Sequence, residues 1–139
     1  MHSRILVLDD EYDCDYICEQ MESYGNGVDY VQESPSTFES DFEWFMNNAK
    51  DWGFEKISEN EFKIVNEDAL WFEMENEIKK CLEDGVKENH WRIEDRVTMK
   101  HGFWIYVNGE LHTLPYFMES LKYQKSNSFK IKTFLDYHF

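Results

Sequence analysis

The 139-residue sequence has little proline, glycine and cysteine. Two prolines and six glycines leave little material for a flexible linker, which favours one domain spanning residues 1–139. Three cysteines, Cys14, Cys18 and Cys81, are too few and odd in number for a disulfide framework, as is typical of the reducing cytoplasm. The longest apolar run near the start, residues 5–8, is far shorter than a membrane span of roughly 20 residues or the apolar part of a signal peptide. We therefore expect a soluble, cytoplasmic protein.

Basic residues are also scarce, and they are unevenly distributed. Residues 1–88 contain 24 Asp and Glu against 7 Lys and Arg, whereas residues 89–139 contain 5 acidic and 7 basic residues. The first part therefore carries a net charge of −17 and the second +2, which add to the −15 of the chain. Such a field repels itself on a compact domain and attracts cationic partners, so it indicates binding to a basic protein. Direct binding to nucleic acid is disfavoured, because phosphate contacts require basic residues.

Aromatic residues, in contrast, are abundant at 17% of the chain. Disordered acidic tails have few aromatic residues, so this composition indicates a folded chain. Each ring buries roughly 150–250 Å² on folding, enough in total for a substantial core.

The hydrophobic pattern predicts an α+β fold. Strands are expected at residues 4–8, 28–32, 54–57, 61–65, 91–99, 103–107, 110–114 and 129–137, and helices at about 11–24, 36–53, 66–85 and 115–122. Ser36 and Glu39 fit a capping box at the start of the second helix, and Asn108-Gly109 fits a type I′ hairpin turn. This order predicts a mixed or antiparallel sheet with three to four helices packed mainly on one face. The acidic part, 1–88, is the more helical, and the near-neutral part, 89–139, is β-rich.

The segment Arg4-Ile5-Leu6-Val7-Leu8-Asp9-Asp10-Glu11 resembles the opening of response-regulator receiver domains. In that family a hydrophobic strand ends in an acidic pair that helps to hold Mg²⁺, a role that the resemblance would give to Asp9 and Asp10. The resemblance covers about thirty residues, to Val28-Asp29-Tyr30-Val31. The phosphoacceptor Asp of the family follows a third apolar strand, and no such strand precedes Asp51 here. A receiver-like Mg²⁺-binding module is one alternative function.

Two further patterns bear on metal binding. Alternating carboxylates resemble part of a Ca²⁺ loop, but the turn Gly and the closing Glu of an EF-hand are missing: Asp9, Glu11, Asp13 and Asp15. Cys14 and Cys18 share a helix face and could supply two Zn²⁺ ligands, but Ile17 lies on the same face and favours buried thiols. We predict no metal site and no cofactor.

Catalytic motifs are missing from the sequence. It contains no Gly-rich phosphate loop, no His-Glu-x-x-His and no Ser in a nucleophile-elbow context. His112 alternates with Leu111 and Leu114 in a predicted hairpin strand, which places it toward solvent. We therefore expect a binding protein and not an enzyme.

The predicted binding surface consists of acidic residues with interspersed aromatic rings. Its members are Asp9, Asp10, Asp13, Asp15, Glu19, Glu22, Glu39, Asp41 and Glu43, with Tyr12, Tyr16 and Trp44. Carboxylates can replace phosphates on a basic nucleic-acid-binding surface, and rings among them suit cation–π contacts to Arg and Lys.

These features predict an inhibitor of a basic nuclease or other nucleic-acid-binding protein. Small phage proteins that inhibit CRISPR or restriction nucleases are similar in size and charge. An immunity protein that neutralises a nuclease toxin is the main alternative. A homodimer is a further alternative, in which basic residues of one copy face the acidic part of another: Lys122, Lys125, Lys130 and Lys132.

Overall fold

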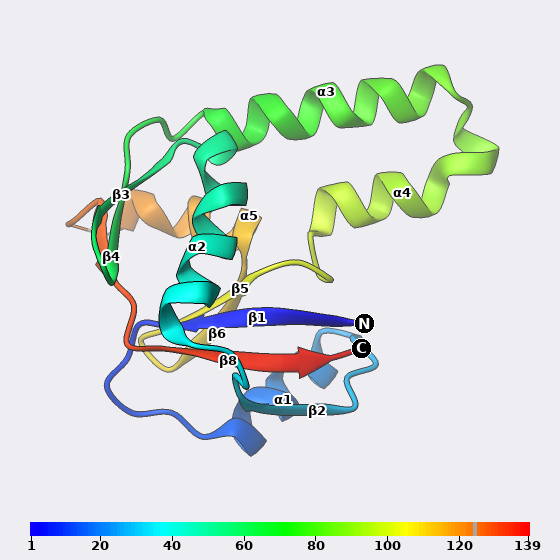
Figure 1. The fold of residues 1–139 in the computed structure, drawn as a ribbon. Coiled ribbons are helices and arrows are strands. Elements are labelled where there is room, and N and C mark those ends of the chain that lie inside the picture. Colours follow the sequence, from blue (N-terminus) through cyan, green and yellow to red (C-terminus); the bar gives the residue numbers. More distant parts are fainter. Residues whose placement is uncertain (124) are drawn as a thin grey trace.

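The computed structural model describes residues 1–123 and 125–139. Within them the chain forms five α-helices, two 3₁₀ helices and eight strands (Figure 1). The strands are β1 (His2–Val7), β2 (Tyr30–Glu33), β3 (Phe54–Ser58), β4 (Glu61–Ile64), β5 (Trp104–Val107), β6 (Glu110–Thr113), β7 (Ser128–Lys130) and β8 (Thr133–His138). The helices are α1 (Cys14–Ser23), α2 (Phe38–Ala49), η1 (Lys50–Trp52), α3 (Ala69–Glu83), α4 (Val86–Thr98), α5 (Leu114–Ser120) and η2 (Leu121–Tyr123).

The strands form two sheets. The larger sheet has the order β2-β8-β1-β5-β6, and the smaller has the order β3-β4-β7. In the larger sheet β1 runs parallel to β5 and antiparallel to β8, and the remaining pairs are antiparallel. The predicted α+β fold with a mixed sheet is therefore confirmed.

The central strand β1 is apolar on both faces, and each face is covered differently. Ile5 packs with Ile17 of α1, whereas Leu6 packs in a separate cluster with Phe45 of α2 and Phe117 of α5. In Figure 1, α1 lies below the sheet and α2 above it. The other helices lie on the α2 side or project from it, so α1 is the exception to the prediction that helices pack mainly on one face.

The strand predicted at residues 91–99 is wrong, because these residues belong to α4. Trp91 and Ile93 alternate with the charged residues Arg92 and Glu94, a pattern that is also typical of a strand. However, Val86, Ile93 and Val97 are also spaced at i, i+7 and i+11, as on one side of a helix. Gly85, with φ of 103°, lies between the end of α3 and the start of α4 and lets the chain reverse there.

Two boundaries also differ from prediction. The second helix is capped by Thr37, whose hydroxyl accepts a hydrogen bond from the Ser40 N–H, and not by Ser36. The strand predicted at 129–137 is divided between β7 of the small sheet and β8 of the large one, with Ile131 buried between them. One buried residue at the crossing lets a single segment join both sheets.

The β5–β6 hairpin is confirmed around Asn108-Gly109. Both residues have positive φ, 55° and 75°, as a type I′ turn requires. Such agreement is expected where a turn is determined by its own two residues.

Helices α3 and α4 form an antiparallel hairpin that extends beyond the sheets (Figure 1), and we call residues 69–98 the arm. In the part of the chain that the structure describes, no helix is long and apolar enough to cross a membrane. The arm carries exposed apolar side chains, among them Phe72 and Trp91.

Candidate protein-binding surface

A shallow depression lies where β1 ends and the chain leads into α1. It is lined by residues 9–13 together with Tyr106 and Gly109. Asp9 uses both carboxylate oxygens to accept hydrogen bonds, from the Asn108 N–H at 2.7 Å and the Gly109 N–H at 2.8 Å. Asp10 is 3.2 Å from the Lys132 ammonium but keeps most of its side chain exposed. Asp9 therefore holds the β5–β6 turn, and Asp10 remains open to a partner.

The outward side of α1 carries a row of carboxylates. Asp13 caps the helix by accepting a hydrogen bond from the Asp15 N–H at 2.9 Å. Asp15, Glu19 and Glu22 are exposed and, among the described residues, none of them has an ion-pair partner. Tyr16 of the same helix is 48% exposed. We give the name α1 surface to Asp15, Tyr16, Glu19 and Glu22 together with the residues that line the depression.

The α1 surface extends toward β2 through Tyr12 and Glu33. The Tyr12 hydroxyl donates a hydrogen bond of 2.7 Å to Glu33, and this bond, with burial, raises the pKa of Tyr12 to about 12. Glu33 is exposed, but it was not among the binding residues predicted from the sequence, where it follows the predicted strand at 28–32. Its position at the end of an acidic segment was the only signal.

The predicted residues on α2 do not join this surface. Glu39 and Glu43 are exposed, but they lie on the helix that covers the opposite face of the sheet. Trp44 is 40% exposed, and its ring packs against Phe103. The predicted surface is therefore divided into two by the sheet.

Asp41 was wrongly placed on the outer face of α2. Its side chain is buried, and its carboxylate accepts a hydrogen bond of 2.9 Å from Arg4 Nε. The sequence contained a signal: Asp41 is three residues after Phe38 and four before Phe45, so it shares their side of the helix. Asp41 is unavailable to a partner.

Arg4 is the only basic residue among the first 49, and it is buried under α2. Its guanidinium binds Asp41 as above and donates a second bond, of 2.6 Å, to the buried Asp136 of β8. The guanidinium carbon is also 5.3 Å from the centroid of the Trp44 ring. This network ties α2 to the sheet, so Arg4 acts in the interior and does not neutralise surface acid.

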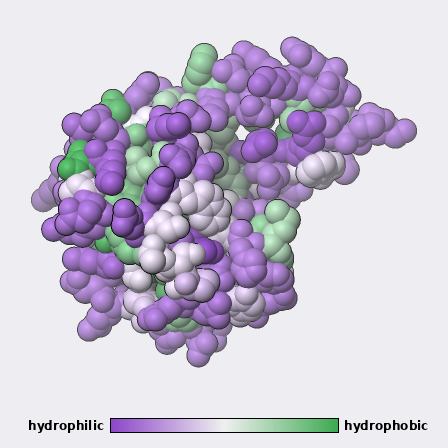
Figure 2. Space-filling model, viewed as in Figure 1, coloured by the Kyte–Doolittle hydropathy of each residue, from purple (hydrophilic) through white to green (hydrophobic). Residues whose placement is uncertain are grey.

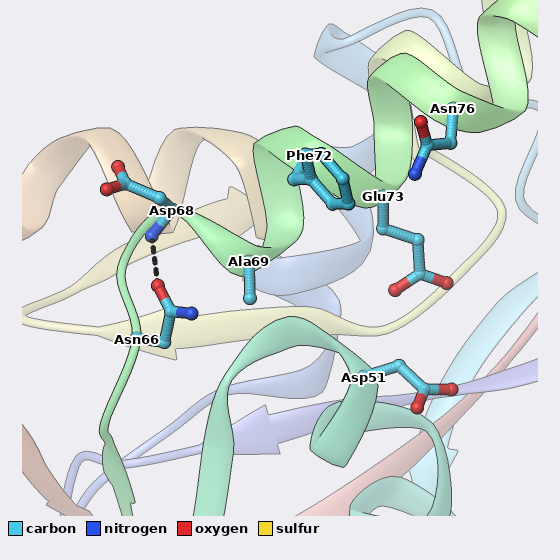
Figure 3. A pocket seen from close by; sticks show the side chains of 7 residues that line it. All are labelled: Asp51, Asn66, Asp68, Ala69, Phe72, Glu73 and Asn76. Atoms are coloured by element: carbon cyan, nitrogen blue, oxygen red, sulfur yellow. Dashed lines mark hydrogen bonds between the residues drawn. The ribbon is translucent and has the colours of Figure 1, made fainter.

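A second acidic hollow lies between α3 and η1 (Figure 3). Its volume is about 590 Å³, and its lining is Asp51, Asn66, Asp68, Ala69, Phe72, Glu73 and Asn76. In Figure 3 the Glu73 side chain points down from α3 toward the part of η1 that carries Asp51. Burial raises the pKa of Glu73, and the nearby charges of Asp51 and Glu77 raise it further. The hollow is at the opposite end of the molecule from α1 (Figure 1), so it is separate from the α1 surface.

The arrangement of the side chains can be compared with the Mg²⁺, Ca²⁺ and Zn²⁺ sites considered from the sequence. Among the described residues no three His, Cys, Asp or Glu side chains are grouped so that they could hold a metal ion. Cys14 and Cys18 are only partly buried, and burial, with nearby carboxylates, raises the pKa of both thiols. Both therefore remain protonated near neutral pH, which makes them weak nucleophiles and weak metal ligands.

We expect Glu22→Gln to stabilise the protein. Glu22 lies in the last turn of α1, where no basic residue is present and the negative end of the helix dipole repels it. Glu19, three residues earlier, adds like-charge repulsion. The expected increase in unfolding free energy is about 0.3–1 kcal/mol at low salt, measured by urea denaturation.

Asp15→Asn is the matched control for that variant. Asp15 lies in the first turn of α1, where the dipole favours a negative charge. The same loss of one charge should therefore destabilise the protein slightly. If both variants changed the free energy of unfolding equally, the position of Glu22 on the helix would not explain its effect.

Comparisons with protein families, curated proteins and solved structures find no match for this chain. The fold and the surface together define a small α+β domain with an exposed, unneutralised acidic helix.

Proposed function

We propose that the protein binds a basic nucleic-acid-binding protein through the α1 surface, in place of nucleic acid. One observation carries the proposal: Asp15, Glu19 and Glu22 are exposed, have no ion-pair partner among the described residues, and lie on a helix that their repulsion destabilises. A solvated surface needs no such arrangement, because mixed charges give solubility without the repulsion. A partner that supplies Lys and Arg would remove the repulsion on binding.

The spacing of these carboxylates suits a phosphate-binding surface. At a rise of about 1.5 Å per residue, Asp15, Glu19 and Glu22 follow one another at intervals of roughly 4.5–6 Å along the helix. Phosphates of one nucleic-acid strand also repeat every few Å, at about 3.4 Å of axis per charge in DNA. Tyr16 and Tyr12 add rings beside the carboxylates, where an Arg side chain can stack.

Occupation of a basic groove by α1 would exclude DNA or RNA from it, so the protein would act as an inhibitor without catalysis. A nuclease is the partner class that we propose, as in inhibitors of the anti-CRISPR or anti-restriction type. Binding of this kind should weaken as salt rises, because exposed charge pairs are screened.

The receiver-like alternative gains no support from the topology. Receiver-type sheets have the parallel order 2-1-3-4-5. Here β1 pairs antiparallel with β8, and β2 lies at the edge of the sheet. Both oxygens of Asp9 are also engaged by the β5–β6 turn. We therefore do not propose a Mg²⁺-dependent function.

The proposal predicts capture of a specific partner. The tagged protein should retain a basic nucleic-acid-binding protein from a lysate of its native cells at low salt, as identified by mass spectrometry. Added DNA or RNA and stepwise NaCl should both release it. The triple variant Asp15→Lys, Glu19→Lys, Glu22→Lys should bind the purified partner at least about 100-fold more weakly, because three charge pairs become repulsive.

The double variant Glu39→Lys, Glu43→Lys is the control, since it changes exposed acids on the other side of the sheet. Its affinity should stay within about threefold of the original, less than 1 kcal/mol. Equal losses from both variants would show that net charge and not the α1 surface determines binding. Capture of a nuclease toxin encoded beside this gene would support the immunity-protein alternative.

A further inference from the structure

The arm packs against the rest of the protein at the first two turns of α3. Leu70 is buried in the hydrophobic cluster on the α2 side of the large sheet, and Met74 packs against the same cluster. The far part of the arm projects beyond the body of the molecule, and the side that faces the viewer in Figure 2 is mostly hydrophilic. The position of the arm therefore depends on the contact at its base.

Glu73 lies in this contact. It is three residues after Leu70 and one before Met74, so it belongs to the side of α3 that faces the body. In Figure 3 its side chain points toward the part of η1 that carries Asp51. Its Oε2 atom is enclosed by the protein and has no hydrogen-bond partner among the described residues. A carboxylate oxygen in such a place is costly to ionise, because no donor replaces the water that it loses.

The charges around Glu73 are mostly negative. Asp51 faces it from η1, Asp68 lines the same hollow at the start of α3, and Glu77 follows one turn later. Arg96 of α4 favours the ionised form, but it lies 3.9 Å from Glu77 and is shared with that residue. Burial, followed by the charges of Asp51 and Glu77, therefore raises the pKa of Glu73.

We propose that the base of the arm is a pH-dependent contact, in which a protonated Glu73 holds α3 against η1 and an ionised Glu73 weakens that contact. A protonated carboxyl group is not repelled by Asp51 and has a hydrogen to donate. After the proton leaves, two carboxylates face each other across the contact, and separation of α3 from η1 lets water reach both. The proposal does not rest on the proposed function, because the hollow is separate from the α1 surface.

The contact should weaken as the pH rises. It raises the pKa of Glu73 above the ordinary value of 4.5, so the closed contact keeps the proton at a pH at which the separated form has lost it. By linkage, the contact has its full strength below about pH 4.5 and loses strength as the pH rises through the raised pKa. At neutral pH the arm is then held mainly by the apolar packing of Leu70 and Met74.

Hydrogen exchange of the backbone amides, measured by NMR, tests the proposal. Each rate is divided by the intrinsic rate at the same pH to give a protection factor. In the wild-type chain the protection of residues 70–77 should fall about twofold or more between about pH 5 and 7.5, since a pKa shift of one unit corresponds to a factor of ten. The amides of β1, in the centre of the large sheet, report on opening of the whole domain and should change less.

Glu73→Gln keeps the shape of the side chain and removes its charge. At about pH 7.5 the protection of residues 70–77 should be at least about threefold higher than in the wild type and should lose most of its pH dependence. Glu75→Gln is the matched control, because it removes the same charge from an exposed side chain of α3 that pairs with Lys79. Its protection should stay within about twofold of the wild type and keep the wild-type pH dependence.

A wild-type chain in which the protection of α3 does not change with pH would overturn the proposal. Equal effects of Glu73→Gln and Glu75→Gln would also overturn it, since they would reflect net charge alone. A change of equal size in β1 would do the same, because Glu73 would then act on the whole domain and not on the arm. Asp51→Asn, on the other side of the contact, should reduce the pH dependence in part, and an unchanged dependence would contradict repulsion between α3 and η1.

Discussion

Arg4→Met is expected to lower the free energy of unfolding by about 3–5 kcal/mol at neutral pH. Arg4 donates hydrogen bonds to Asp41 at 2.9 Å and to Asp136 at 2.6 Å, and all three side chains are buried. Methionine fills much of the same volume but leaves two carboxylates inside the protein without their main cationic partner. The cost of an unpaired buried charge, and not a lost contact, dominates the effect.

Urea denaturation of three variants separates this cost from other effects. Lys132→Met, which removes the exposed ion pair with Asp10, should change stability by no more than about 1 kcal/mol. Adding Asp41→Leu and Asp136→Leu to Arg4→Met should recover most of the loss, because apolar groups then replace the whole network. A loss below about 1 kcal/mol for Arg4→Met alone would contradict a stabilising role for the network.

Gly53→Ala is expected to cost at least about 3 kcal/mol. Gly53 has φ of +83°, and a Cβ built on it would clash with the backbone oxygen of Asn66. The left-handed conformation costs Ala about 1–2 kcal/mol, and moving the backbone away from the added methyl costs roughly 1–3 kcal/mol more. The Gly53 carbonyl also accepts hydrogen bonds from the Val65 and Asn66 N–H groups. These bonds hold in place the backbone that would have to move to make room for the methyl group.

Gly25→Ala is the control, since Gly25 has the same φ of +83° with nothing within 4 Å of the added Cβ. It should cost only the conformational part, about 1–2 kcal/mol. The difference between the two variants in the same denaturation experiment measures the close approach at Asn66. Equal losses would show that the backbone accommodates the methyl group without strain.

Local signals in the sequence predicted most of the secondary structure. The Asn108-Gly109 turn was found because two residues determine it. The helix at 86–98 was missed because its apolar residues fit both a strand and a helix, and packing against α3 decides between them. The boundary between β7 and β8 depends on which sheet each half joins, which is a property of the whole fold.

The sequence correctly identified residues of the candidate site only where an acidic residue is also exposed in the folded chain. The α1 carboxylates follow from helix periodicity, and they are exposed as expected. The sequence did not reveal that α1 and α2 cover opposite faces of β1, because Ile5 and Leu6 are equally apolar. Nor did it reveal the pairing of Arg4 with Asp41, since these residues are 37 positions apart and meet only in the folded chain.

The pairing of β1 with β8 has a consequence for the order of events during folding. The two strands pair along their whole length, from His2 with His138 to Val7 with Thr133. During synthesis β1 emerges well over a hundred residues before its neighbour β8. Loop closure over that separation is slow, and β1 presents an apolar, unpaired edge until it is complete. The large sheet can therefore close only after β8 has been made, and until then the apolar edge of β1 is open to aggregation.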